Sequence, residues 1–264
     1  METANPPVVT GSNARMASAR RQFYSVALWL ARLSQSYIPS DPSRQNLRLR
    51  WLADKRSLST QPFCDHLTLE LKLPDLHLQF MEDGRPVPHV LDAEDRTPAA
   101  TEAWILVELL HRGIDRKAFS KSLPFENADL MSGDSESYAP DSYEPELAEL
   151  TDQLTGGIGI LDSLAKELGA NDGVWITPET MHADIVVVPH VSPTNGRANV
   201  RIGFSLGDER TGEPYFYVVP QDHGTVRSLR PDKLLTASQI DTNGMTPTAV
   251  TAFLRNAATG TKPI

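Results

Sequence analysis

Apolar and polar residues alternate in several short segments, and this alternation constrains the fold more than any other feature of the sequence. In the first third of the chain, apolar residues stand at every second position of segments 47–51, 67–71 and 76–80. The spacing is typical of strands with one buried face, because successive side chains of a strand point to opposite sides. Pro74-Asp75 and Asp83-Gly84 look like turns. The pattern predicts adjacent antiparallel strands.

Strand signals return in the second half of the chain. The run from Ala183 to Val188 is apolar apart from Asp184, which predicts a central strand covered on both faces. Asn195-Gly196 is a strong hairpin signal. Further strands are expected at 174–176, 200–204 and 215–219. The strands that begin near Leu47, Leu67, Leu76, Ala183, Val200 and Tyr215 are expected to form one sheet.

Segments with helical spacing separate the strands. They lie at 23–37, 97–111, 147–168 and 246–257. Thr97-Pro98 and Thr246-Pro247 are typical helix starts, with Thr as the N-cap and Pro in the first turn. In the second helix we expect Trp104, Val107, Leu110 and His111 to share the inward face. Gly156 and Gly157 interrupt the third helix. Together the patterns predict an α+β fold, mainly an antiparallel sheet packed by several helices.

The 264 residues fit one large domain. We expect residues 1–14 to form a disordered tail and residues 15–264 a single α+β domain. No Lys or Arg occurs from Phe125 to Thr151, where acids and serines accumulate. This composition predicts an acidic loop at about 127–142 that is mobile and dispensable for folding.

Charge and cysteine content argue against several classes of protein. The net charge is −9, so the chain on average repels nucleic acid and anionic membranes. No segment approaches the roughly 20 apolar residues of a membrane span. The single cysteine, Cys64, excludes an internal disulfide and a thiolate zinc cluster, and favours a cytoplasmic location. Bases dominate from Arg15 to Arg56. We interpret them as a solvated face or one that docks the acidic loop; nucleic-acid binding there is the alternative and would depend steeply on salt.

His182 and Asp184 are the candidate metal ligands. They lie two apart at the start of the most apolar predicted strand, so both side chains face the same side. Imidazole and carboxylate suit a divalent metal ion with an open coordination position. The structural alternative is a simple hydrogen bond between the two side chains.

Asp208 and Glu213 are the candidate catalytic residues. They belong to the segment Gly207-Asp208-Glu209 and the following Glu213-Pro214-Tyr215, which joins two predicted strands near one end of the sheet. Their carboxylates can act as a general base or as metal ligands. A solvated turn is the alternative. Glu126 is an outer candidate.

The same segments resemble a family of bacterial domains of unknown function. That family has a Trp-Pro-x-His-Phe-Asp strand and a Ser-Pro-Gly-Asp-Glu…Glu-Pro-Tyr-x-Tyr-Val segment. The counterparts here are His182-Ala183-Asp184, Ser205-Leu206-Gly207-Asp208-Glu209 and Glu213-Pro214-Tyr215-Phe216-Tyr217-Val218, in the same order. Glu179-Thr180 replaces the Trp-Pro, and Leu206 replaces a proline. The resemblance implies a fold and the place of a site, but no activity.

Two functions follow as hypotheses. The first is a small-molecule-binding protein whose site comprises His182, Asp184, Asp208 and Glu213; a metal-assisted enzyme is the more specific form of this hypothesis. The second is a non-catalytic protein-interaction module whose acidic loop binds a basic partner.

Overall fold

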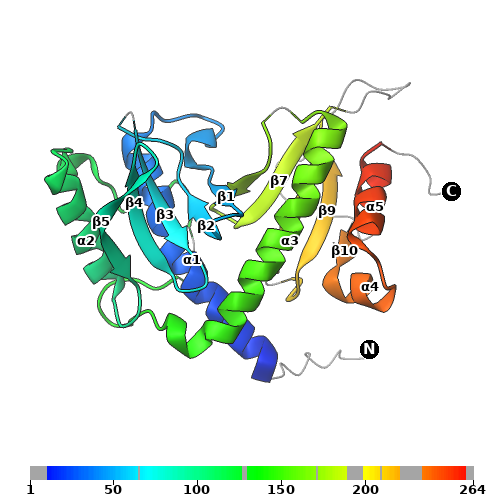
Figure 1. The fold of residues 1–264 in the computed structure, drawn as a ribbon, viewed down its shortest axis with the longest axis horizontal. Helices are drawn as coiled ribbons and strands as arrows, with labels where there is room; N and C mark the ends of the chain where they lie inside the picture. Colours follow the sequence, from blue (N-terminus) through cyan, green and yellow to red (C-terminus); the bar gives the residue numbers. More distant parts are fainter. Residues whose placement is uncertain are drawn as a thin grey trace, which may run out of the picture.

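The computed structural model has an α+β fold with two antiparallel sheets, and Figure 1 shows them side by side. It describes residues 11–64, 66–126, 130–170, 172–188, 199–208, 210–220 and 234–259. The strands of the first sheet, in spatial order, are β1 (Arg50–Leu52), β2 (Ser57–Ser59), β3 (Leu67–Lys72), β4 (His77–Glu82) and β5 (Arg85–Asp92). Those of the second are β10 (Leu234–Thr236), β9 (Tyr215–Pro220), β8 (Val200–Ser205), β7 (His182–Val187) and β6 (Trp175–Thr177).

The prediction of one sheet is therefore wrong. The strands of the first third form one sheet, and those of the second half form another. The two sheets meet at one backbone bridge, where Leu49 and Ile176 exchange two hydrogen bonds of 2.9 Å. One cluster of buried hydrophobic side chains nevertheless draws on both sheets, from Leu69 and Phe80 of the first to Ile185 and Phe204 of the second.

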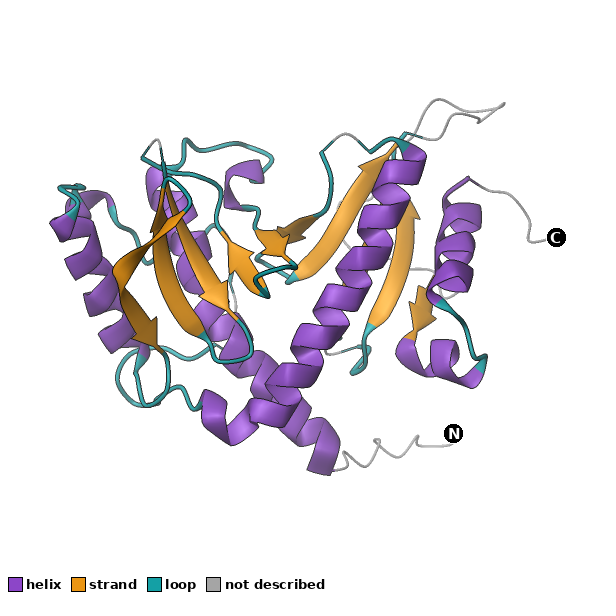
Figure 2. Cartoon of the chain, in the orientation of Figure 1, coloured by secondary structure: helices purple, strands orange, loops and turns teal. Residues whose placement is uncertain are grey.

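The helices pack against the two sheets, and Figure 2 shows them as purple ribbons beside the orange strands. The longer ones are α1 (Gly11–Tyr37), α2 (Pro98–His111), α3 (Glu144–Leu168) and α5 (Pro247–Thr259), and α4 (Ala237–Thr242) is a short one. Helix α1 packs on the first sheet, α3 packs on β7 and β8, and α5 packs on β8 and β9. Helices α1 and α3 also contact each other. No described helix combines the length and the apolar character that a bilayer crossing requires.

Helix α2 starts as predicted, but its buried face differs from the expected one. Thr97 caps the helix by accepting a hydrogen bond from the Ala100 N–H. Val107 and Leu110, expected inside, are 45% and 51% exposed, whereas Ile105, Glu108 and Leu109 are buried. The apolar positions of this helix run round its circumference, so spacing alone allowed two choices of inward face. The prediction chose the wrong face, and the buried carboxylate of Glu108 was therefore missed.

The acidic loop is packed in residues 130–142, where the structure describes it, contrary to the expected lack of packing; its dispensability for folding stays a prediction. Met131 and Tyr138 are buried, and the Tyr138 hydroxyl accepts a hydrogen bond of 3.1 Å from the Trp29 indole N–H. Glu136 forms a bidentate ion pair with Arg21 of α1. Basic residues of α1 therefore dock the acidic segment, as one of the interpretations of the basic face predicted.

The described residues test the remaining expectations only in part. Helix α1 begins at Gly11, so residues 11–14 are not part of a tail; the rest of the predicted tail and the Asn195-Gly196 hairpin lie outside the described residues. Strand β5 was missed. Pro86 and Pro88 interrupt its pattern, and prolines are tolerated there because β5 is an edge strand. The short elements β2, β10 and α4 were also missed.

Helix α3 continues through its glycines without a break from Glu144 to Leu168. Gly157 faces the second sheet, and a Cβ atom there would lie 2.5 Å from the ring of Phe204 in β8. Gly156 and Gly159 are exposed, with nothing within 4 Å of an added Cβ. Gly157 therefore permits a close approach of helix and sheet, whereas its neighbours have no such role.

We expect opposite effects from alanine at these positions. Gly156→Ala should stabilise the protein by up to about 1 kcal/mol, because alanine favours helix over glycine. Gly157→Ala should destabilise it by about 1–3 kcal/mol, because the Phe204 ring must move. Urea unfolding of both variants measures the difference. Equal effects at the two positions would contradict the close contact.

Candidate functional site

Buried polar side chains gather on one face of the second sheet. In the β7–β8–β9 register, Asp184 pairs with Gly203 and Gly203 with Tyr217, so these residues share a face. Helices α3 and α5 pack on the opposite face, where Phe204 and Phe216 lie. We call the first face the polar face; its members are His182, Asp184, Arg201, Gly203, Ser205, Tyr215 and Tyr217.

Tyr217 lies across the middle of the polar face. A Cβ atom on Gly203 would overlap the end of its ring, so glycine is required for the tyrosine to lie over β8. The side chain is completely buried, and its hydroxyl has no hydrogen-bond partner in the described part of the chain. Burial raises the pKa of this hydroxyl well above its ordinary value, with the charge of Asp184 acting in the same direction. Tyr217 is therefore a neutral polar group that is free to donate or accept a hydrogen bond.

His182 is the buried imidazole of the polar face. Its ring packs against Tyr215 and Tyr217 at centroid distances of 5.9 and 5.5 Å. Burial lowers its pKa to about 4, while the nearby charge of Asp208 acts in the opposite direction. The imidazole is thus neutral at neutral pH, and no described residue forms a hydrogen bond with its Nδ1 atom. A neutral imidazole can act as a ligand or as a base.

Asp184 shares the face with His182 but pairs with a different residue. Its carboxylate is buried and lies 3.9 Å from Nε of Arg201. Burial raises its pKa, against the opposing charges of Arg201 and Arg48. The structure records no direct hydrogen bond between His182 and Asp184 among the described residues, although both were expected on one side of the strand and both are there.

Asp208 lies in the turn between β8 and β9 and is held by its own loop. Its carboxylate accepts hydrogen bonds from the Arg210 and Thr211 N–H groups and from the Tyr215 hydroxyl, the last at 2.7 Å. Burial raises the pKa of Asp208, but these donors outweigh it and hold the pKa below its ordinary value. Gly207, with φ of +105°, gives the turn its shape. Asp208 is an anion bound to Tyr215, which in turn packs on His182.

Glu213 and Glu126 stand apart from this group. The Glu213 carboxylate accepts hydrogen bonds from the backbone N–H and the hydroxyl of Ser238, so it anchors the first turn of α4. Glu126 is exposed. No three ligating atoms of His182, Asp184, Asp208 and Glu213 come within 4.8 Å of one another. A metal ion held by these residues stays a prediction.

A pocket adjoins the polar face where the two sheets meet. Its volume is about 300 Å³. Trp175, which lines it, is the cross-strand partner of Asp184. The Arg50 guanidinium stacks 3.4 Å from the centre of the Trp175 ring and donates to the carbonyls of Val174 and Asp172, both at 2.7 Å. Six described residues line the pocket: Gln45, Arg48, Arg50, Gln61, Asp172 and Trp175.

A second group of polar residues, on the first sheet, was missed by the sequence analysis. His89, Glu108 and His111 bring three ligating atoms within 4.8 Å of one another, the one such group of histidine, cysteine or acidic residues in the described part of the chain. The signal was present: Glu108 and His111 are three apart on a helix, and such residues are neighbours on its surface. The misassigned face of α2 concealed it.

Comparison of the chain with protein-family models, with curated proteins and with solved structures gave no significant match. The candidate sites are therefore defined by their geometry alone.

The depressed pKa of His182 has a consequence for stability. Between pH 6.5 and 4 the unfolded chain binds a proton that the native imidazole does not, so stability falls as the pH falls through this range. His182 contributes on the order of 3 kcal/mol to this loss of unfolding free energy. Urea unfolding at pH 7 and pH 4.5 should show a smaller loss of stability for His182→Gln than for the wild type. The exposed His66→Gln variant serves as control. The same pH dependence in wild type and His182→Gln would show that His182 is not buried as a neutral group.

Proposed function

We propose that the protein binds a small anionic molecule, a carboxylate or a phosphate, in the pocket between the two sheets. The observation that carries the proposal is the pair of arginines in its lining. Arg50 is held in place by two carbonyls and an aromatic ring, whereas the Arg48 guanidinium has no hydrogen-bond partner among the described residues. Guanidinium groups bind carboxylate and phosphate oxygens through pairs of parallel hydrogen bonds.

The surroundings of the pocket support this proposal. Its volume of about 300 Å³ is at the lower end of the range for small-molecule sites. The Gln61 amide donates to the carbonyls of Gln45 and Arg48, which fixes the backbone from which Arg48 projects. Arg48 and Arg50 therefore start from ordered backbone, and less entropy is lost when an anion binds.

The polar face lies next to the pocket, but its members are not among the described residues that line it. Asp184 lies beside Trp175, and the charge of Arg48 acts on it. The Tyr217 hydroxyl and the His182 Nδ1 atom are buried and have no hydrogen-bond partner among the residues that the structure describes. Buried polar groups are usually hydrogen bonded, so these atoms are suited to a polar guest or to ordered water. A metal-assisted reaction at His182, Asp184 and Asp208 is a further step that this proposal does not require.

The interaction-module hypothesis has less support. Glu136 of the acidic segment is paired with Arg21, and Glu146 with Arg15. The negative charge that was expected to attract a basic partner is thus partly neutralised within the chain.

Titration calorimetry with inorganic phosphate, phosphoserine, succinate and citrate tests the proposal. At least one of these anions should bind, and Arg48→Gln should weaken its affinity about 10- to 100-fold, the value of a charged hydrogen bond of about 1.5–3 kcal/mol. The matched control is Arg44→Gln, which removes a nearby exposed arginine paired with Glu179.

The proposal fails if none of the four anions binds the wild type. It also fails if Arg48→Gln and Arg44→Gln weaken binding equally, because the anion would then respond to general positive charge and not to the pocket.

A further inference from the structure

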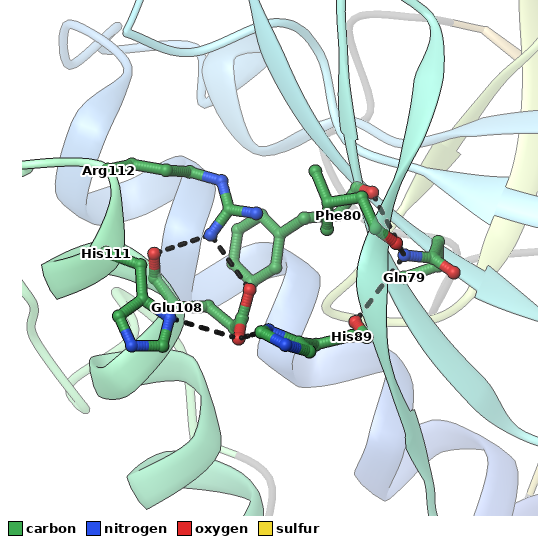
Figure 3. Close-up of polar contacts among 7 residues, drawn as sticks. Gln79, Phe80, His89, Glu108, His111 and Arg112 are labelled. Atoms are coloured by element: carbon green, nitrogen blue, oxygen red, sulfur yellow. Dashed lines mark hydrogen bonds and ion pairs between the residues drawn. The ribbon is translucent and has the colours of Figure 1, made fainter.

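A buried carboxylate on the first sheet is approached by two histidines. Glu108 lies on the inner face of α2 and is 2% exposed, whereas the side chains of His89 on β5 and His111 on α2 are 60% and 54% exposed. Figure 3 shows both imidazoles pointing toward the same end of the Glu108 side chain. The group joins β5, one edge strand of the first sheet, to the helix beside it, whereas the pocket borders β1, the opposite edge of the same sheet.

The two oxygens of Glu108 have different partners. Oε2 accepts a hydrogen bond of 2.9 Å from Nη1 of Arg112, which also donates to the Glu108 carbonyl oxygen at 2.6 Å. Arg112 in turn lies over the ring of Phe80, 5.1 Å from its centre. Oε1 faces the histidines, with Nδ1 of His89 at 3.0 Å and Nδ1 of His111 at 3.7 Å. Arg112 therefore holds the carboxylate in place while leaving one oxygen for the imidazoles.

A hydrogen bond to Oε1 accounts for His89, whose Nδ1 lies 3.0 Å away, but not for His111, whose Nδ1 at 3.7 Å is too far for one. The approach of the second imidazole to the same oxygen needs another explanation. A metal ion accounts for it directly, because it needs three lone pairs that converge on one point. Tetrahedral zinc with bonds of about 2.0–2.1 Å places its ligand atoms roughly 3.3 Å apart. The separations of Glu108 Oε1 from Nδ1 of His89, 3.0 Å, and from Nδ1 of His111, 3.7 Å, lie on either side of that value.

We propose that His89, Glu108 and His111 bind one divalent transition-metal ion, with Zn²⁺ as the best fit, and that water completes its coordination. Two imidazoles and one carboxylate favour zinc and its neighbours over magnesium or calcium, which prefer oxygen ligands. The exposed histidines make the site accessible from solvent. Because Arg112 neutralises the charge of Glu108, the site attracts the cation mainly through its nitrogen ligands, which favours soft or borderline ions further.

Binding at this site would link β5 to α2 through the metal. An ion that binds only the folded protein stabilises it in proportion to the logarithm of its concentration over Kd. A zinc-dependent rise in the unfolding midpoint is therefore expected alongside direct binding.

The test is calorimetric titration of the full chain with ZnCl₂, repeated on His89→Gln and His111→Gln. We expect one zinc ion per chain for the wild type and at least a tenfold loss of affinity for each variant. His77→Gln is the matched control. It removes a histidine of the same sheet that lies 3.6 Å from a single carboxylate, that of Asp92, and it should leave the affinity unchanged. Both target histidines are exposed, so their loss should not prevent folding; circular dichroism checks this.

A second measurement uses Co²⁺ in place of zinc. The visible absorption of tetrahedral cobalt should appear in the wild type and in His77→Gln, and should be absent from the two target variants. The proposal is overturned if the wild type binds neither ion, if both target variants bind as the wild type does, or if His77→Gln loses binding to the same extent.

Discussion

Two backbone hydrogen bonds between Leu49 and Ile176 join the two sheets, and the position of one sheet relative to the other depends on this junction. Each sheet on its own is a chain of antiparallel neighbours with a face to bury. The bridge sets the edges of β1 and β6 beside each other, so that α1 and α3 can contact each other and close a hydrophobic cluster shared by both sheets. The pocket exists because two twisted sheets that touch at one point cannot fill the space beside it with backbone.

The second sheet combines an apolar face with a polar one, and this contrast explains how polar groups without partners can persist in its interior. A buried hydroxyl or imidazole without a hydrogen bond costs about 1–3 kcal/mol. The close contact of α3 with β8 at Gly157 and Phe204 buries apolar surface on the opposite face and offsets such a cost. Neutral forms of His182 and Tyr217 keep the cost from rising further, because a buried charge would be far more expensive.

The sequence predicted the local secondary structure well and the pairing of distant strands poorly. Alternation placed β3, β4, β8 and β9, and the Thr-Pro pairs placed the starts of α2 and α5, because these signals depend on neighbouring residues. Period-2 spacing says nothing about which strands pair, so two sheets were taken for one. The site residues on β7 followed from the same spacing, but the role of Glu213 as an anchor for α4 depends on Ser238, which lies in an unpredicted element. The group of His89, Glu108 and His111 could be predicted only from the correct buried face of α2. Apolar residues lie all round that helix, so their spacing did not identify this face.

Arg50 belongs to the first sheet, yet its guanidinium contacts Trp175 at the edge of the second sheet and the carbonyls of Asp172 and Val174 in the segment that leads into it. Any separation of the sheets must therefore pull this side chain away from its partners and open the pocket at the same time. A molecule bound in the pocket would contact the edges of both sheets and hold them together. By thermodynamic linkage, an occupant that favours the closed junction would bind more tightly after any change that stabilises the closed junction.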